Sequence, residues 1–260
     1  MGASLKSELR KLFSVRSTYI LLGLALVYMA FYDFFIVGFR ANAKHHGDFF
    51  VNYHSHYYIF SEVARSGGIS PPILFCSIVA VLLMAHEYRY NTIMYTLTAS
   101  NSRSKTLLAK FLAVTGFAIL FALFVEILSP SLAVLGMHVH HLSTTGQVFF
   151  YKQFFVRVLF YSWAYSTIGL LLAIFFRNLV AAIAALFLLP VAIEPLISLL
   201  LTTNQQQYLP FNAMTAVIDN GILQPGANQL SALRSALVVI VYLVVFWLIA
   251  WFSFLKRDAN

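Results

Sequence analysis

The sequence predicts an all-α, polytopic membrane protein with six transmembrane helices. Of its 260 residues, 60% are hydrophobic and only 10% are charged, whereas soluble domains carry about 25% charged residues. A helix needs about 20 mostly apolar residues to cross a bilayer, and six apolar segments of the sequence are close to this length. Because the connections between them are short, no soluble domain fits, and we expect one membrane domain over residues 1–260. A soluble enzyme, a disordered chain and a disulfide scaffold are excluded, the last because Cys76 is the only cysteine.

The six predicted spans follow one another along the chain. They cover residues 19–39, 71–85, 107–128, 154–176, 179–201 and 233–255. Arg177 and Asn178 alone join the fourth and fifth spans, which predicts a tight helical hairpin. Pro190 and Pro195 predict a break or kink near the end of the fifth span, because proline removes a backbone donor from the helix.

The distribution of basic residues predicts the orientation. With the N-terminus inside, eleven of the seventeen lysine and arginine residues lie on the cytoplasmic side, as the positive-inside rule requires. We therefore expect a multi-pass protein of a prokaryotic plasma membrane with both termini in the cytoplasm. The net charge of +8 is assigned to contact with anionic lipid head groups and not to nucleic acid. A cleaved signal peptide is disfavoured, because the first apolar run exceeds the usual length of about 7–15 residues.

Residues 1–17 predict an amphipathic helix at the inner membrane interface. Its apolar residues recur at helical spacing: Leu5, Leu9, Leu12 and Phe13. Basic residues lie between them: Lys6, Arg10 and Lys11. A topogenic positive flank and an interfacial helix that moves with a partner are both compatible with this pattern.

Two long connections are predicted to have structure of their own. The cytoplasmic loop over residues 86–106 contains a central stretch, 92–98, that favours a short helix along the membrane. The outer loop over residues 202–232 contains Pro210, Pro225 and two apolar patches. It is predicted to hold short helices, and they would re-enter the outer leaflet if protein shelters their backbone.

Four ionisable residues are predicted within or near the spans: Asp33, Glu126, Arg157 and Glu194. Such groups are costly in a bilayer and indicate function by default. One interpretation is structural, with water or Arg157 neutralising an acid near the outer interface. The other is a polar lining of a pathway for a translocated solute.

Histidines gather in the predicted outer segments: His54, His56, His138, His140 and His141. Imidazole binds zinc, copper or nickel, and it also titrates near neutral pH. No cysteine or strongly acidic ligand accompanies these residues at the spacing of a structural zinc site. We therefore expect no metal site, and the histidines remain only candidate ligands.

Motifs for catalysis are missing. No glycine is followed by lysine, so the chain has no phosphate-binding G-x-x-x-x-G-K-[ST] loop. H-E-x-x-H, G-x-S-x-G and C-x-x-C are also absent. An intramembrane protease of the aspartyl type needs two intramembrane aspartates, and Asp33 is the one candidate. We expect a protein that is not an enzyme and that carries no cofactor itself.

Two segments carry a resemblance to a known family. LKSELRKLFSVRSTYILL (residues 5–22) and EYRYNTIMYTLTASNSRSKTLLAKF (residues 87–111) resemble the N-terminal helix and the inner loop of the permease subunits of type 2 ABC transporters, which are small six-span exporters. The span count and the outer segment with LPF at residues 209–211 also agree. The resemblance covers nearly the whole chain, with loose motifs. The His-rich first outer loop is longer than this family needs.

The resemblance implies a function and partners. Two permease subunits, as a homo- or heterodimer, would form the pathway, and separate ATP-binding subunits would bind ATP and magnesium beneath them. The ATPase would contact the inner loop, and the resemblance assigns six residues to this coupling surface: Glu87, Arg89, Thr92, Ile93, Leu97 and Arg103. Lys6, Arg10 and Lys11 would lie in the neighbouring interfacial helix. The exported solute would be amphipathic, a peptide, a drug or lipid-like.

Two other functions compete with this one. An ion- or proton-coupled carrier acting alone would need acids near the midplane and internal repeats, but the acids lie toward the outside and no repeat is evident. A non-transporting sensor built on the external histidines would respond to pH or metal without ATP.

Overall fold

The chain folds into a bundle of long helices. The computed structural model describes residues 2–37, 70–100, 102–139, 152–219 and 230–256. Within these ranges no strand occurs, and six helices are long and apolar enough to cross a membrane. The predicted all-α class and all six predicted spans are therefore confirmed.

The helices differ widely in length, and two segments, η1 and η2, are π-helical. The elements are α1 (Gly2–Ser14), α2 (Arg16–Met29), η1 (Ala30–Val37), α5 (Ser70–Arg89), α6 (Ile93–Ser100), α7 (Arg103–Val139), α8 (Lys152–Phe176), α9 (Leu179–Leu188), η2 (Leu189–Ile193), α10 (Glu194–Ser198), α11 (Thr203–Gln206), α12 (Pro210–Asp219) and α13 (Ala232–Lys256).

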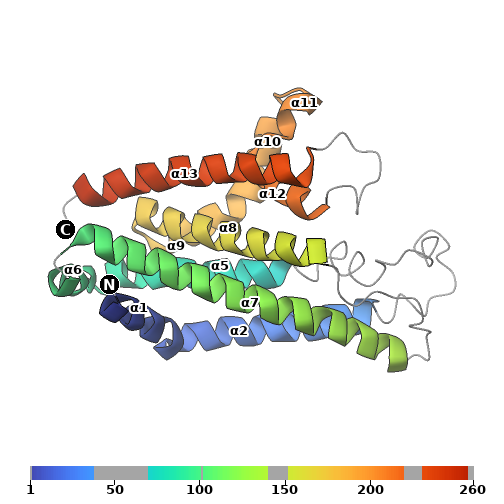
Figure 1. Cartoon of the computed structure of the whole chain (residues 1–260), viewed down its shortest axis with the longest axis horizontal. Coiled ribbons are helices and arrows are strands. Elements are labelled where there is room, and N and C mark those ends of the chain that lie inside the picture. Colours follow the sequence, from blue (N-terminus) through green and yellow to red (C-terminus); the bar gives the residue numbers. More distant parts are fainter. Residues whose placement is uncertain (1, 38–69, 101, 140–151, 220–229, 257–260) are drawn as a thin grey trace.

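The long helices run side by side along the longest axis of the molecule (Figure 1). α5 and α8 are the most buried of the spans, whereas α2, the α9–α10 span and α13 expose most of their apolar side chains. α1, α6 and the end of α13 lie at one end of the bundle (Figure 1). Apolar exposure of this extent fits contact with lipid, where helices satisfy their backbone hydrogen bonds internally.

The centre of the bundle depends on a close approach of α5 to α8. A Cβ atom added at Gly169 of α8 would lie 2.7 Å from the backbone oxygen of Ser77 in α5. Only glycine permits this separation, and small residues of this kind let membrane helices pack closely. Ser162 of α8 adds a hydrogen bond by donating its hydroxyl to the carbonyl oxygen of Ala118 in α7 at 3.1 Å.

The second span is longer than predicted. α5 continues past residue 85 to Arg89, so Glu87 belongs to the last turn of this helix and not to a loop. The connection that follows is a tight turn in which Asn91 has a φ of 53°. The predicted short helix in the inner loop is present as α6.

The fifth span is distorted, as its prolines predict. Asn178 begins α9 by accepting hydrogen bonds from the backbone N–H groups of Val180 and Ala181, and Arg177 before it has a φ of 53°. Since Pro190 has no N–H to donate, the helix changes to π geometry over Leu189–Ile193 before α10 begins.

The connection between α10 and α13 contains two short helices, α11 and α12. α11 begins with a capping box formed by Thr202 and Gln205. α12 packs against α8 and α13 and buries Phe211, Met214 and Val217. Residues 220–229 of the predicted re-entrant segment lie outside the described residues.

Candidate functional site

Four charged side chains meet at the end of the bundle where α6 lies. Lys110 of α7 pairs with Glu8 of α1 and with Glu87 of α5, each at 2.7 Å from its Nζ atom. Lys11 of α1 pairs with the same two acids, at 2.7 Å from Glu8 and 2.5 Å from Glu87. We call these four residues the charge cluster. Two positive and two negative charges make it neutral overall.

The charge cluster is largely removed from solvent. Lys110 is fully buried, and Glu8 and Glu87 expose 2% and 4% of their surface. Burying single ions in this way costs several kcal/mol per ion, and only well-formed pairs offset that cost. Glu8 and Lys11 pair within α1, whereas Glu87 and Lys110 find their partners only when α1, α5 and α7 are packed together. Within the charge cluster, the Glu87 Oε2 atom has no hydrogen-bond partner among the described residues.

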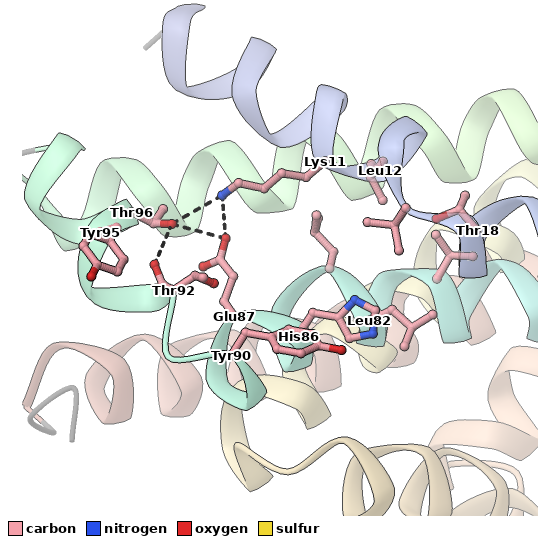
Figure 2. A pocket seen from close by; sticks show the side chains of 13 residues that line it. Lys11, Leu12, Thr18, Leu82, His86, Glu87, Tyr90, Thr92, Tyr95 and Thr96 are labelled. Carbon is pink, nitrogen blue, oxygen red and sulfur yellow. Dashed lines mark hydrogen bonds and ion pairs between the residues drawn. The ribbon is translucent and has the colours of Figure 1, made fainter.

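A hydroxyl group links α6 to the charge cluster. Thr96 Oγ1 accepts a hydrogen bond from Lys11 Nζ at 3.4 Å. Its single hydrogen lies within reach of Glu87 Oε1 at 3.4 Å and of the Thr92 carbonyl oxygen at 3.2 Å. Figure 2 shows Lys11 extending from α1 toward Thr96 and Glu87. Polar contacts thus join α6 to α1 and to the end of α5, the second span.

The charge cluster changes the pKa of the ammonium group of Lys11, a residue that lies before the first span. Burial alone would lower the pKa of its ammonium group. Hydrogen bonds from that ammonium to Glu8 and Glu87, together with their negative charges, outweigh the burial and raise the pKa above its ordinary value of 10.5. The lysine therefore remains charged at physiological pH.

A cavity of about 430 Å³ lies beside the charge cluster. Lys11, Glu87 and Thr96 line it together with His86 and Tyr90 (Figure 2). Side chains of the second span, among them Val79, Leu82 and Leu83, continue its apolar wall. The cavity lies between α6, the end of α5 and the start of α2. Beside it, α1 contacts α6 through the hydrogen bond from Lys11 to Thr96.

The predicted coupling residues fall into two groups. Glu87 of α5 is buried in the charge cluster, and Ile93 of α6 is buried with 2% of its surface exposed. Both side chains therefore pack their helices against the rest of the bundle. Arg89 and Thr92 are exposed, and Arg103 is partly exposed at the start of α7. Leu97 lies in α6, and its side chain is outside the described part. Among the described side chains of α6, Met94 and Tyr95 form an exposed apolar surface.

The structure also places the predicted interfacial basic residues. Lys6 and Arg10 are exposed on α1, whereas Lys11 points into the charge cluster. Two members of this cluster were not among the predicted site residues, Glu8 and Lys110. The sequence counts Lys110 only among the eleven basic residues of the predicted cytoplasmic side, although an ionisable residue inside an apolar run by itself indicates a buried partner. Glu8 has the signal of lying one turn before Lys11.

The predicted intramembrane polar residues do not form one group. Glu194 accepts backbone hydrogen bonds from Phe211 N–H at 2.9 Å and Asn212 N–H at 2.6 Å. These groups are at the start of α12, where the helix leaves its donors unpaired and carries a partial positive charge. Glu194 is therefore a helix cap, and its role is structural.

The other two acids lie on η1 and α7, which pack against each other. Asp33 of η1 is fully buried and accepts a hydrogen bond from the Ser129 hydroxyl at 2.5 Å. Glu126 is buried, and neither of its carboxylate oxygens has a partner among the described residues. The predicted ion pair of Arg157 with Glu126 or Glu194 is absent there, since the described ion pairs all belong to the charge cluster.

The histidine candidates are mostly outside the described residues, namely His54, His56, His140 and His141. His138 is exposed at the end of α7. In the described part, no group of three or more metal-ligating side chains is close enough to hold an ion.

Comparison with known proteins gives a family without an assigned activity. The model of a family described as a protein of unknown function, DUF2705, matches residues 54–259. This range covers most of the chain, and the protein belongs to that family. No curated protein matches the sequence.

Proposed function

We propose that this member of the DUF2705 family is the membrane subunit of an ATP-driven exporter. A separate chain would bind ATP and magnesium, and this chain would form the pathway for an amphipathic, peptide, drug or lipid-like solute. The charge cluster is the observation that supports the proposal most. It joins α1 and α6, the two elements that the resemblance to type 2 ABC permeases assigns to coupling, to the ends of the second and third spans.

The geometry supports transmission of force from α6 to the spans. Met94 and Tyr95 expose 49% and 76% of their surface and would contact the ATPase. Ile93 on the opposite side of α6 is buried against the bundle. A partner that displaces α6 would act on Thr96, and through it on Lys11 and Glu87. A neutral cluster of four charges resists separation, because each ion would otherwise remain buried and unpaired.

The proposal requires α1 and α6 to be on the cytoplasmic side. They lie at the same end of the bundle as the end of α13 (Figure 1), and six spans return the chain to the side on which it starts. The exposed apolar faces of α2, α9 and α13 would contact lipid or a second permease subunit.

The test is purification of the tagged chain from its native cells in mild detergent, followed by mass spectrometry of co-eluting proteins. We expect a stoichiometric partner that carries a Walker loop. The double variant Met94→Ser/Tyr95→Ser should lose this partner. Leu199→Ser/Leu200→Ser is the matched control, because these residues are 80% and 87% exposed after α10 and should leave the partner bound.

Purification without any ATPase in several mild detergents would contradict the proposal. A carrier acting alone, or a sensor that responds to pH or metal, would then account better for the same architecture. If both double variants lose the partner, the proposal of an ATPase partner stands, but α6 is rejected as its specific contact surface.

A further inference from the structure

The contact between η1 and α7 contains acidic groups whose hydrogen bonds are incomplete. Asp33 exposes 0% and Glu126 exposes 6% of its surface. Three of their four carboxylate oxygens have no hydrogen-bond partner among the described residues, Asp33 Oδ1 and both oxygens of Glu126. Both residues lie within predicted membrane spans, where an ionised group without a partner is costly.

Asp33 contacts α7 one turn away from Glu126. Ser129, the partner of Asp33, lies three residues after Glu126, and residues at this spacing share one side of a helix. Pro130 follows directly and lies inside α7. Because Pro130 has no N–H, the carbonyl oxygen of Glu126, four residues earlier, loses its helical donor. The site thus offers a surplus of acceptors and a deficit of donors and positive charge.

Aromatic residues lie near Asp33 in the sequence, along α2 and η1. Tyr28 and Tyr32 stack with their ring centroids 5.4 Å apart, and Phe34 and Phe35 are in edge contact at 5.0 Å. The faces of aromatic rings attract cations, most strongly where water is excluded. Aromatic rings on the same span as Asp33 are therefore compatible with a ligand that has a positive charge on an apolar body.

We infer that Asp33 and Glu126 bind the protonated amine of an amphipathic solute. An alkyl ammonium group supplies the missing positive charge and up to three N–H donors for the unpaired oxygens. This inference rests on the proposed function, for which it names the class of substrate. Glu194 is not part of the proposed site, because its carboxylate oxygens already accept hydrogen bonds from the backbone at the start of α12.

The test uses a matched pair of fluorescent probes, a dansyl-labelled alkyl amine and its N-acetylated derivative, which has the same length but no charge. Binding is measured by fluorescence on the full chain in lipid nanodiscs, with empty nanodiscs as the correction for partition. We expect the amine to bind with a Kd lower by about tenfold or more, equivalent to about 1.4 kcal/mol. Glu126→Gln and Asp33→Asn should remove most of this preference, and Glu194→Gln should retain it.

A second measurement on the unmodified protein does not depend on the folding of variants. A hydrophobic carbodiimide modifies carboxyl groups in apolar surroundings, and mass spectrometry locates the modified residues. The amine, but not its acetylated derivative, should protect Glu126. Equal binding of the two probes, or equal protection by both, would overturn the inference and indicate acids that are simply protonated.

The exporter proposal and the amine-binding inference can be rejected independently of each other. If an ATPase co-purifies but the amine and the amide bind alike, only the substrate class is rejected. If the amine is preferred but no ATPase is found, the binding site remains and the exporter proposal is rejected.

Discussion

Lys110 of α7 lies 2.7 Å from Glu8 of α1, although 102 residues separate them in the sequence. The same ammonium group is 2.7 Å from Glu87 of α5. One buried lysine thus fixes the N-terminal helix to the ends of the second and third spans. This arrangement makes the end of the bundle where α1 and α6 lie a single electrostatic unit.

Replacement of Lys110 by methionine should destabilise the protein strongly. Two buried acids would then share Lys11 alone, and removal of one partner from a buried pair costs about 3–5 kcal/mol. We expect this decrease in the free energy of unfolding, measured by denaturation in detergent micelles. Lys105→Met is the control, since Lys105 is exposed in the first turn of α7 and should change stability little.

A second variant tests the electrostatic cause. Glu8→Gln combined with Lys110→Met removes one charge of each sign and should recover part of the lost stability. A double variant that is as unstable as the sum of both single variants would argue against coupling between these residues.

Gly169 should tolerate no side chain. Gly169→Ala places a Cβ atom 2.7 Å from the Ser77 oxygen, and overpacking of this kind costs about 1–3 kcal/mol. Gly116→Ala in α7 is the matched control, because nothing lies within 4 Å of its added Cβ and alanine favours the helix by up to about 1 kcal/mol. The two substitutions should shift the melting temperature in opposite directions, and a decrease of similar size in both would contradict the close contact.

Glu194→Ala should loosen α12 selectively. The backbone N–H groups of Phe211 and Asn212 would lose a charged acceptor, and each hydrogen bond to a charged group contributes about 1.5–3 kcal/mol. Amide hydrogen exchange within Pro210–Asp219 should accelerate while exchange in α5 stays slow. Glu194→Gln, which retains one carbonyl oxygen, should have a smaller effect. Unchanged exchange in α12 with Glu194→Ala would reject the capping role.

The stability of the protein should fall at high pH through Lys11. Its pKa is raised in the folded state, so the folded protein holds the proton more tightly than the unfolded chain. Its contribution is then complete below about pH 10.5, the unfolded value, and is lost as the pH rises through the folded pKa. Denaturation between pH 9 and pH 12 should show a steeper decrease for the native protein than for Lys11→Met. Parallel curves would contradict the raised pKa.

The hydrophobic pattern was sufficient for the architecture. Each predicted span corresponds to a helix, because a bilayer requires about 20 apolar residues and internal backbone hydrogen bonds. Pro190 correctly predicted the distortion of the fifth span. The end of the second span was placed too early, because Glu87 looks like a loop residue until Lys110 is known to neutralise it.

The candidate site was predicted only in part. Glu87 and Lys11 were singled out, but as residues of a surface, and they are instead partners in a buried cluster. The sequence leaves Glu194 with two interpretations, an acid neutralised by water or Arg157 and a pathway residue, and in the structure it accepts backbone hydrogen bonds at the start of α12. Glu8 is not among the predicted site residues, because its one local signal, the position one turn before Lys11, does not reveal that α5 and α7 pack against it.

The sequence by itself determined the class of the protein, its six spans and the short inner-loop helix, since these depend on composition and periodicity within one segment. The tertiary structure decided which charges are paired. Whether Lys110 is a topogenic residue or the centre of the charge cluster depends on Glu8 and Glu87, which reach it only when three helices pack. Coulombic and hydrogen-bond energies depend on separations of a few ångströms between segments far apart in the chain, and local patterns contain no information about them.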